Sequence, residues 1–289
     1  MGVQRTFARR LARGLMATGV LVATAAAVSA AATARADEVF ADKALEAAVR
    51  AVALKHQDPN KDLTDEDLAK VFILEAPDRE ITSLAGLERC KNLALLKLSG
   101  NAISDLSPLR ELATLQSLDL AGNQISDIGP LAGTTRLQYL DLSRNQVVDL
   151  SPLAQCQALS ALYAAGNQIR DLAPLAGLER LSSLDVARNQ LTSIEALREI
   201  RRLSLLDLSD NQLEDLAPLS AQTDLRILIV ERNQIADLAA VVDWARADAE
   251  GDQRFAPFLR LYLAENPLSE AAREVQLPAL AELGVRVHE

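Results

Sequence analysis

Aspartates that recur at a fixed interval are the residues of this chain best suited to chemistry. Ordered carboxylates can bind metal ions or transfer protons. Most of these aspartates, however, precede the sequence Leu-x-Pro-Leu, which is typical of a helix start whose capping side chain accepts a backbone hydrogen bond. Ser193, another good capping residue, takes the same place in one repeat. We therefore predict capping residues and no metal site at Asp105, Asp127, Asp149, Asp171, Asp215 and Asp237.

Other catalytic groups are scarce. The two histidines, His56 and His288, lie near the ends of the sequence, and no phosphate-binding glycine loop, CxxC, HExxH or GxSxG motif occurs. Acid–base work by aspartate pairs would take place on an open surface that does not exclude water. The sequence therefore predicts no enzyme activity, no catalytic residue and no cofactor.

The two cysteines, Cys90 and Cys156, occupy equivalent positions in repeats that are three steps apart. Three repeats stacked at the spacing of β-strands separate them by roughly 14 Å. A disulfide needs Cα atoms within about 7 Å. Since leucine or isoleucine fills this position in other repeats, we predict two free thiols that are buried as small hydrophobic groups.

An asparagine that recurs at a constant interval sets the framework for these positions. Leucines keep the same interval, and the pair represented by Leu118 and Leu120 alternates with outward residues, as in a strand with one buried face. A short fixed period predicts a stacked solenoid. A buried asparagine after each strand can satisfy backbone groups of two coils with its amide. The predicted structural ladder comprises Asn101, Asn123, Asn145, Asn167, Asn189, Asn211, Asn233 and, after a longer step, Asn266.

The repeats resemble the 22-residue class of leucine-rich repeats. The phrase Asn-Gln-Ile-x-Asp-Leu-x-Pro-Leu occurs at residues 167–175, and a helical segment stands before the first repeat. This combination is similar to the internalin-type proteins of bacteria. The resemblance covers about residues 38–289. It implies an α/β solenoid, a leucine-rich repeat horseshoe. A parallel β-sheet would line its concave face and short 3-10 or helical turns its convex face, between a helical N-terminal cap and an α/β C-terminal cap.

Composition predicts four segments. Residues 1–36 have a basic start, an alanine-rich apolar run and the small-x-small site Ala34-Arg35-Ala36, as in a secretory signal peptide. An uncleaved membrane anchor is the alternative. Helical spacing from about Asp42 to Lys55 and a capped start at Thr64 predict an N-terminal cap over 37–80. Repeats follow over 81–266, with an irregular insertion within about 241–257, and then a C-terminal cap over 267–289.

Charge restricts the partners. Five of the 30 basic residues lie within residues 1–36 and all 40 acidic residues lie after residue 36, so the mature chain would carry a net charge of −15. Such acidity argues against nucleic acid and anionic membranes and favours partners with cationic groups. No membrane insertion is expected after signal cleavage. The sequence does not determine the oligomeric state.

Outward strand positions carry the candidate binding residues. An acidic track of Asp119, Asp141, Asp185 and Asp207 places like charges on adjacent strands, with partial compensation expected from Arg144 and Arg188. The track either selects a cationic partner or is a solvated acidic face. Apolar residues form the second candidate surface, as a protein contact or as a face covered by the insertion or a second copy. They are Tyr139, Tyr163, Leu205, Ile227, Ile229 and Tyr262. Trp244, Phe255 and Phe258 are predicted to lie in the core.

These features predict an exported, periplasmic or secreted, non-enzymatic recognition scaffold that binds a protein or peptide on its concave face. The alternatives are a structural envelope protein and a glycan-binding or cell-wall-binding module. Glycan sites usually use aromatic platforms, and aromatic residues make up 3% of this chain.

Overall fold

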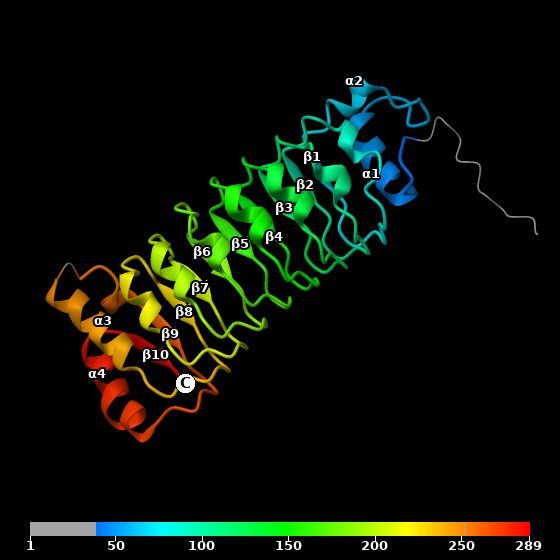
Figure 1. The fold of residues 1–289 in the computed structure, drawn as a ribbon. Coiled ribbons are helices and arrows are strands. Elements are labelled where there is room, and N and C mark those ends of the chain that lie inside the picture. Colours follow the sequence, from blue (N-terminus) through cyan, green and yellow to red (C-terminus); the bar gives the residue numbers. More distant parts are fainter. Residues whose placement is uncertain (1–38, 252) are drawn as a thin grey trace, which may run out of the picture. The chain divides into compact units, whose positions relative to one another are not determined.

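The computed structural model describes residues 39–251 and 253–289, so the predicted signal peptide lies outside the described residues. These residues form one parallel sheet of ten strands that pair in chain order, each with the next (Figure 1). The strands are β1 (Ile73–Glu75), β2 (Leu95–Lys97), β3 (Ser117–Asp119), β4 (Tyr139–Asp141), β5 (Ala161–Tyr163), β6 (Ser183–Asp185), β7 (Leu205–Asp207), β8 (Ile227–Ile229), β9 (Arg260–Tyr262) and β10 (Arg286–His288). The predicted leucine-rich repeat solenoid is confirmed.

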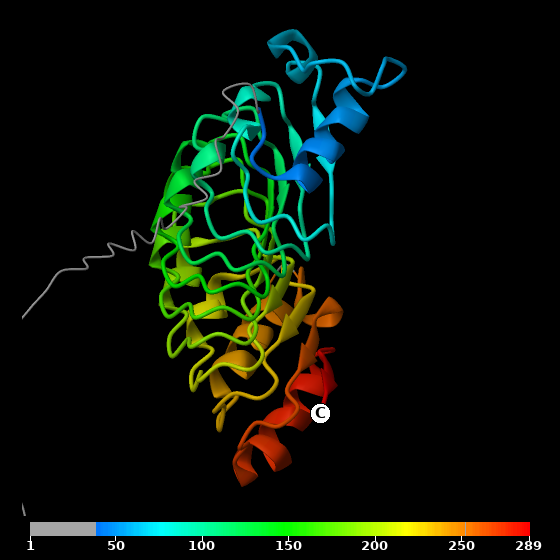
Figure 2. The ribbon, with the colours of Figure 1, turned by 90° about the vertical axis from the view of Figure 1, so that its right-hand side faces the viewer.

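Short 3-10 helices return the chain from one strand to the next. They lie on the side of each coil opposite the strands (Figure 2). Their bounds are η1 (Leu87–Arg89), η2 (Ser107–Leu109), η3 (Gly129–Gly133), η4 (Ser151–Gln155), η5 (Ala173–Leu175), η6 (Glu195–Glu199), η7 (Ala217–Ala221) and η8 (Ala256–Phe258). Since a 3-10 turn rises about 2 Å per residue, these helices span the coil with few residues.

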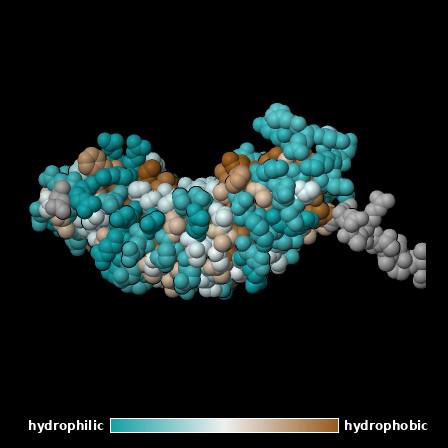
Figure 3. All heavy atoms as spheres, turned by 90° about the horizontal axis from the view of Figure 1, so that it is seen from above, coloured by the Kyte–Doolittle hydropathy of each residue, from teal (hydrophilic) through white to brown (hydrophobic). Residues whose placement is uncertain are grey.

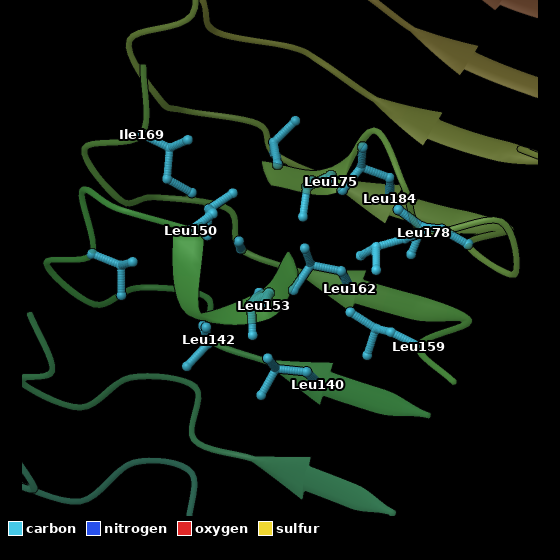
Figure 4. Close-up of a cluster of buried hydrophobic side chains, with 14 of the residues drawn as sticks. Leu140, Leu142, Leu150, Leu153, Leu159, Leu162, Ile169, Leu175, Leu178 and Leu184 are labelled. Atoms are coloured by element: carbon cyan, nitrogen blue, oxygen red, sulfur yellow. The ribbon is translucent and has the colours of Figure 1, made fainter. Parts of the chain in front are cut away.

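Leucines from both sides of each coil fill the core. The central strand residues Leu118, Leu140 and Leu162 are fully buried and in register across β3, β4 and β5. Leucines of the 3-10 helices, such as Leu153, meet them from the opposite side (Figure 4). The period of two along each strand turns every second side chain outward, which leaves the flanking residues half-exposed.

Two helices precede the sheet. Asp42 accepts hydrogen bonds from the N–H groups of Ala44 and Leu45 at the start of α1 (Lys43–Ala53). Thr64 and Asp67 form a reciprocal capping box at the start of α2 (Asp65–Leu68). The sheet itself starts with β1, earlier than the residue 81 at which the repeats were expected to begin.

The irregular insertion is helix α3 (Ala239–Glu250) followed by η8. Trp244 and Phe255 are buried and stacked, with ring centroids 4.1 Å apart. Phe258 was predicted in the core, but 57% of its surface is exposed and Arg226 lies 4.9 Å over its ring. The core prediction was wrong for Phe258 because the 3-10 turn of η8 directs its ring outward. The chain then forms β9, a π-helical turn (Ala272–Gln276), α4 (Leu277–Glu282) and β10.

The asparagines join successive coils through their side-chain amides. Asn167 donates to the carbonyls of Leu142 and Ala164 at 2.9 and 3.0 Å, and its Oδ1 accepts the N–H of Val147 at 2.9 Å. The same three contacts recur along the solenoid. Each asparagine therefore closes its own turn and holds the preceding coil.

The recurrent aspartates form Asx turns at the starts of the 3-10 helices. Asp105 accepts the N–H of Ser107 at 2.8 Å, and Asp171 accepts that of Ala173 at 2.8 Å. Each aspartate stands one residue before the N-cap position, which is an apolar residue such as Leu106. The side chains thus serve backbone hydrogen bonding as expected, but in an i to i+2 turn.

Both cysteines are free and buried, as predicted. Burial raises the pKa of the Cys90 thiol to about 11, and it also raises the pKa of Cys156. Neither sulfur is therefore a reactive thiolate near neutral pH.

The residue before each asparagine adopts a left-handed backbone conformation. Glycine fills this place in three coils, but Arg144 holds it with φ 57°. A side chain in this conformation costs about 1 kcal/mol or more, and Arg144 makes no ion pair within the described part of the chain. We expect Arg144→Gly to raise the free energy of unfolding by about 1 kcal/mol, measured by urea denaturation.

Arg232 is the matched control, since it shares the conformation with φ 52°. It also holds Asp210 through contacts of 2.6 and 2.8 Å. Arg232→Gly should therefore give no such gain. An equal gain from both substitutions would contradict the assignment of strain to the backbone of Arg144.

Candidate functional site

The outward residues of the sheet form two columns that run along the solenoid. Asp119 pairs with Asp141, and Asp185 with Asp207, directly across adjacent strands. The column then continues through Ile229 and Tyr262 to His288. The predicted juxtaposition of like charges is therefore present. These side chains lie on the strand side, which is hollowed between two raised ends in Figure 3.

Tyr139 and Tyr163 form a pair in the middle of the sheet. Their ring centroids are 5.6 Å apart with an interplanar angle of 42°. Burial, followed by the charges of Asp141 and Asp119, raises the pKa of Tyr139 to about 12. Tyr139 therefore remains a neutral phenol that presents both an apolar ring and a hydroxyl group.

One oxygen of each aspartate in the acidic track is engaged by the backbone. Asp119, Asp141, Asp185 and Asp207 each accept the N–H of the residue two positions ahead, at 2.9–3.1 Å. This bond fixes the carboxylate against the sheet. Four ordered acceptors therefore follow the sheet as two pairs separated by Tyr163.

Asp185 is the aspartate whose environment most clearly opposes ionisation. Burial raises its pKa, and the charges of Asp207 and Asp141 raise it further. Asp185 therefore favours the folded state when it is protonated and loses this contribution as pH rises through its folded-state pKa. Asparagine keeps the Oδ1 acceptor used by Ala187.

We expect Asp185→Asn to raise the free energy of unfolding by up to about 1 kcal/mol at pH 7, with the gain vanishing in the acidic range where Asp185 is already protonated. Urea denaturation at a series of pH values measures this. Asp119→Asn is the control, because the carboxylate of Asp119 also accepts a bond from Ser99. A gain for Asp185→Asn that persists unchanged at acidic pH would contradict the electrostatic cause.

A hollow of about 460 Å³ brings the acidic and apolar candidates together. Its lining includes the acidic residues Asp185 and Asp207 and the apolar residues Ile229 and Tyr262. All four are half-buried. The rim holds Arg188, Arg232, Asp210 and Glu231. A group that enters this hollow meets carboxylates and apolar surface at once.

Compensation of Asp185 by Arg188 is weak. Arg188 contacts Asp210 of the next coil at 3.5 Å, and Arg232 holds that same carboxylate. Arg188 is only the last and smallest of the influences on the pKa of Asp185. Their positions at the left-handed turns direct both side chains along the rim, so Asp185 and Asp207 stay available.

The remaining predicted residues lie outside this hollow. Tyr139, Tyr163, Asp119 and Asp141 belong to the middle of the sheet, and Arg144 lies on the turn beyond it. Leu205 and Ile227 pair in the neighbouring column and are half-buried. The insertion packs through α3 against η7 and η8.

Sequence reasoning missed an exposed apolar residue at the N-terminal end of the same face. Ile73 is 53% exposed, and Phe72, which directly precedes β1, is 55% exposed. Ile73 pairs with Leu95 and so extends the outward column by one strand. The signal was present, because Leu74 lies one full repeat before Leu96.

Two further observations concern metal binding and membrane spans. Within residues 39–251 and 253–289, no group of three or more His, Cys, Asp or Glu is arranged to hold a metal ion. Over the same residues, no helix combines the length and apolar character needed to cross a membrane.

Comparison with known proteins agrees with this architecture. The family profile described as leucine-rich repeats (2 copies) matches residues 113–155. Internalin C2 from Listeria monocytogenes is 33% identical and has a TM-score of 0.68, with coverage of 71% of this chain and 91% of that chain. A leucine-rich repeat protein of Leptospira interrogans shares the fold at 21% identity and a TM-score of 0.66, over 78% of this chain and 62% of that one.

No curated protein matches the chain. The likeness to internalin C2 nevertheless extends over most of both chains. The regular repeat and the parallel strands are features of that same architecture. This chain therefore belongs to the internalin-like family of leucine-rich repeat proteins.

Proposed function

We propose that this protein is an exported recognition scaffold that binds a segment of another protein on the outward face of its sheet. The hollow lined by Asp185, Asp207, Ile229 and Tyr262 is the observation that carries the proposal. Leucine-rich repeat proteins use such open surfaces for protein contacts. The scaffold itself acts without catalysis.

The lining of the hollow defines the chemistry of the partner. Two adjacent carboxylates, each fixed by a backbone hydrogen bond, favour a lysine or arginine side chain. Ile229 and Tyr262 lie next in register and offer apolar area to the side-chain stem or to a neighbouring residue. The tyrosine pair provides a second anchor along the sheet. The partner is therefore a basic segment with interspersed apolar residues.

Export is supported by the first 36 residues. Their basic start, apolar run and small-x-small site fit a cleaved signal sequence. Removal of this segment leaves a strongly acidic protein, which suits attraction of a cationic partner.

A pull-down from an extract of the producing organism tests the proposal. The immobilised wild-type protein is compared with the variant Tyr163→Ala/Ile229→Asp, which removes one anchor and places a charge in the hollow. We expect the variant to lose at least about nine-tenths of a specific partner, the tenfold loss of a hot-spot contact.

Val148→Asp is the matched control. Val148 is 53% exposed and lies on the turn after Asn145, outside the sheet. It should recover the partner as the wild type does. Equal recovery of every protein by the wild type and the double variant would overturn the proposed function.

A further inference from the structure

A second hollow, of about 800 Å³, lies at the edge of the solenoid where the chain enters β6, β7 and β8. Its lining includes Ser182 and Ser204, which directly precede β6 and β7. The asparagine ladder follows the opposite ends of the strands. This hollow is therefore separate from the outward face proposed to bind protein.

Arginines dominate its lining. Arg180, Arg201, Arg202 and Arg254 face the hollow, and Asp224 is the one acidic residue among them. Asp224 is paired with Arg254. The other three arginines are exposed and have no carboxylate partner within the described ranges 39–251 and 253–289. A local excess of positive charge thus stands on a chain whose formal net charge is −10.

The insertion holds one wall of the hollow in place. The carboxylate of Asp248 accepts hydrogen bonds from the N–H groups of Arg254, Phe255 and Ala256 at 2.9, 3.1 and 2.9 Å. Arg226 also donates to the carbonyl of Arg254. These bonds fix the backbone from which Arg254 projects, so the fourth arginine is positioned by tertiary structure.

The repeat itself sets the spacing between Arg180 and Arg202. Arg180 and Arg202 occupy the same repeat position in successive coils. Neighbouring strands lie about 4.8 Å apart, and guanidinium groups bind phosphate oxygens through paired hydrogen bonds. The hydroxyl group of Thr223 lines the same hollow. Cations at this spacing suit anionic groups that are neighbours within one ligand.

We propose that this hollow binds a small ligand that carries two or more adjacent phosphate groups. The proposal stands apart from protein binding on the sheet, because the two surfaces have opposite charge. Arg180, Arg201 and Arg202 contact the phosphate oxygens, while Arg254 closes the side formed by the insertion. Screening by salt weakens the interaction.

Calorimetric titration of the full chain with tripolyphosphate, and separately with orthophosphate, tests the proposal. The variant Arg180→Gln/Arg202→Gln removes two of the arginines without burying new groups. The control, Arg136→Gln/Arg170→Gln, removes the same charge outside the hollow. Arg136 occupies the repeat position of Arg180 two coils earlier, and Arg170 bonds to the side chain of Gln190.

We expect saturable binding of tripolyphosphate at least about tenfold tighter than that of orthophosphate. The Arg180→Gln/Arg202→Gln variant should bind tripolyphosphate about tenfold more weakly, or worse, with an unchanged melting temperature in the absence of ligand. The control should stay close to the wild type. The proposal is overturned if the wild type shows no saturable binding, if the control loses as much affinity, or if orthophosphate binds as tightly.

Discussion

Replacing Asn167 with alanine is expected to reduce the free energy of unfolding by roughly 3 kcal/mol or more. The substitution leaves the buried N–H of Val147 without its partner, which costs about 1–3 kcal/mol. The carbonyls of Leu142 and Ala164 each lose one of two donors, since Asn145 and Asn189 still donate to them, and each lost hydrogen bond costs about 1 kcal/mol. The cavity left by the amide offers no compensating contact.

Urea denaturation measures this loss. Gln168→Ala is the matched control, because Gln168 is the next residue along the chain and its side chain is exposed. The control should change stability by less than about 0.5 kcal/mol. A loss below about 1 kcal/mol for Asn167→Ala would contradict this expectation, since water or local rearrangement would then satisfy the N–H of Val147.

Neutralising Asp185 and Asp207, the two acids that line the hollow on the outward face of the sheet, should both stabilise the fold and weaken partner binding. In Asp185→Asn/Asp207→Asn, the amide oxygens can still accept the backbone N–H groups of Ala187 and Ser209. The like-charge pair across β6 and β7 disappears, which raises stability. A basic partner loses two carboxylates, which should weaken binding about tenfold or more.

The combination of a stabilised fold and a weakened complex identifies a functional surface. A merely solvated acidic face would give only the first effect. Titration of the double variant with the captured partner at two salt concentrations separates the two cases. Asp119→Asn, outside the hollow, is expected to leave the affinity nearly unchanged. An unaltered affinity in the double variant would contradict the role of Asp185 and Asp207.

Much of this structure could be predicted from the interval between asparagines. That interval determines which leucine is buried and which neighbour faces outward, so the register of Asp119 with Asp141 followed from it. Strand β1 was missed because Arg79 stands where the first asparagine would be. Asn101 reaches back instead and accepts the N–H groups of Arg79 and Ile81. The first strand therefore lacks the asparagine of its repeat but keeps the hydrogen bonds.

Features that depend on the insertion could not be predicted. Neither the outward turn of Phe258 nor the placement of Arg254 has a repeat equivalent, since both depend on α3 and on the buried carboxylate of Asp248. The course of Arg188 toward Asp210 was missed for a related reason. Two side chains on left-handed turns of adjacent coils meet along the rim, and a pattern of residue types does not give this direction.

Site-specific photo-crosslinking tests whether the outward face of the sheet binds a protein partner. A photoreactive benzophenone side chain replaces Ile229 in the hollow in one protein and Val148 on the turn in another. Both proteins are irradiated in extract of the producing organism. We expect one discrete crosslinked partner from position 229, absent from position 148 and competed by excess wild-type protein. Equal crosslinking from both positions, or none from position 229 beside strong crosslinking from position 148, would contradict recognition by the outward face of the sheet.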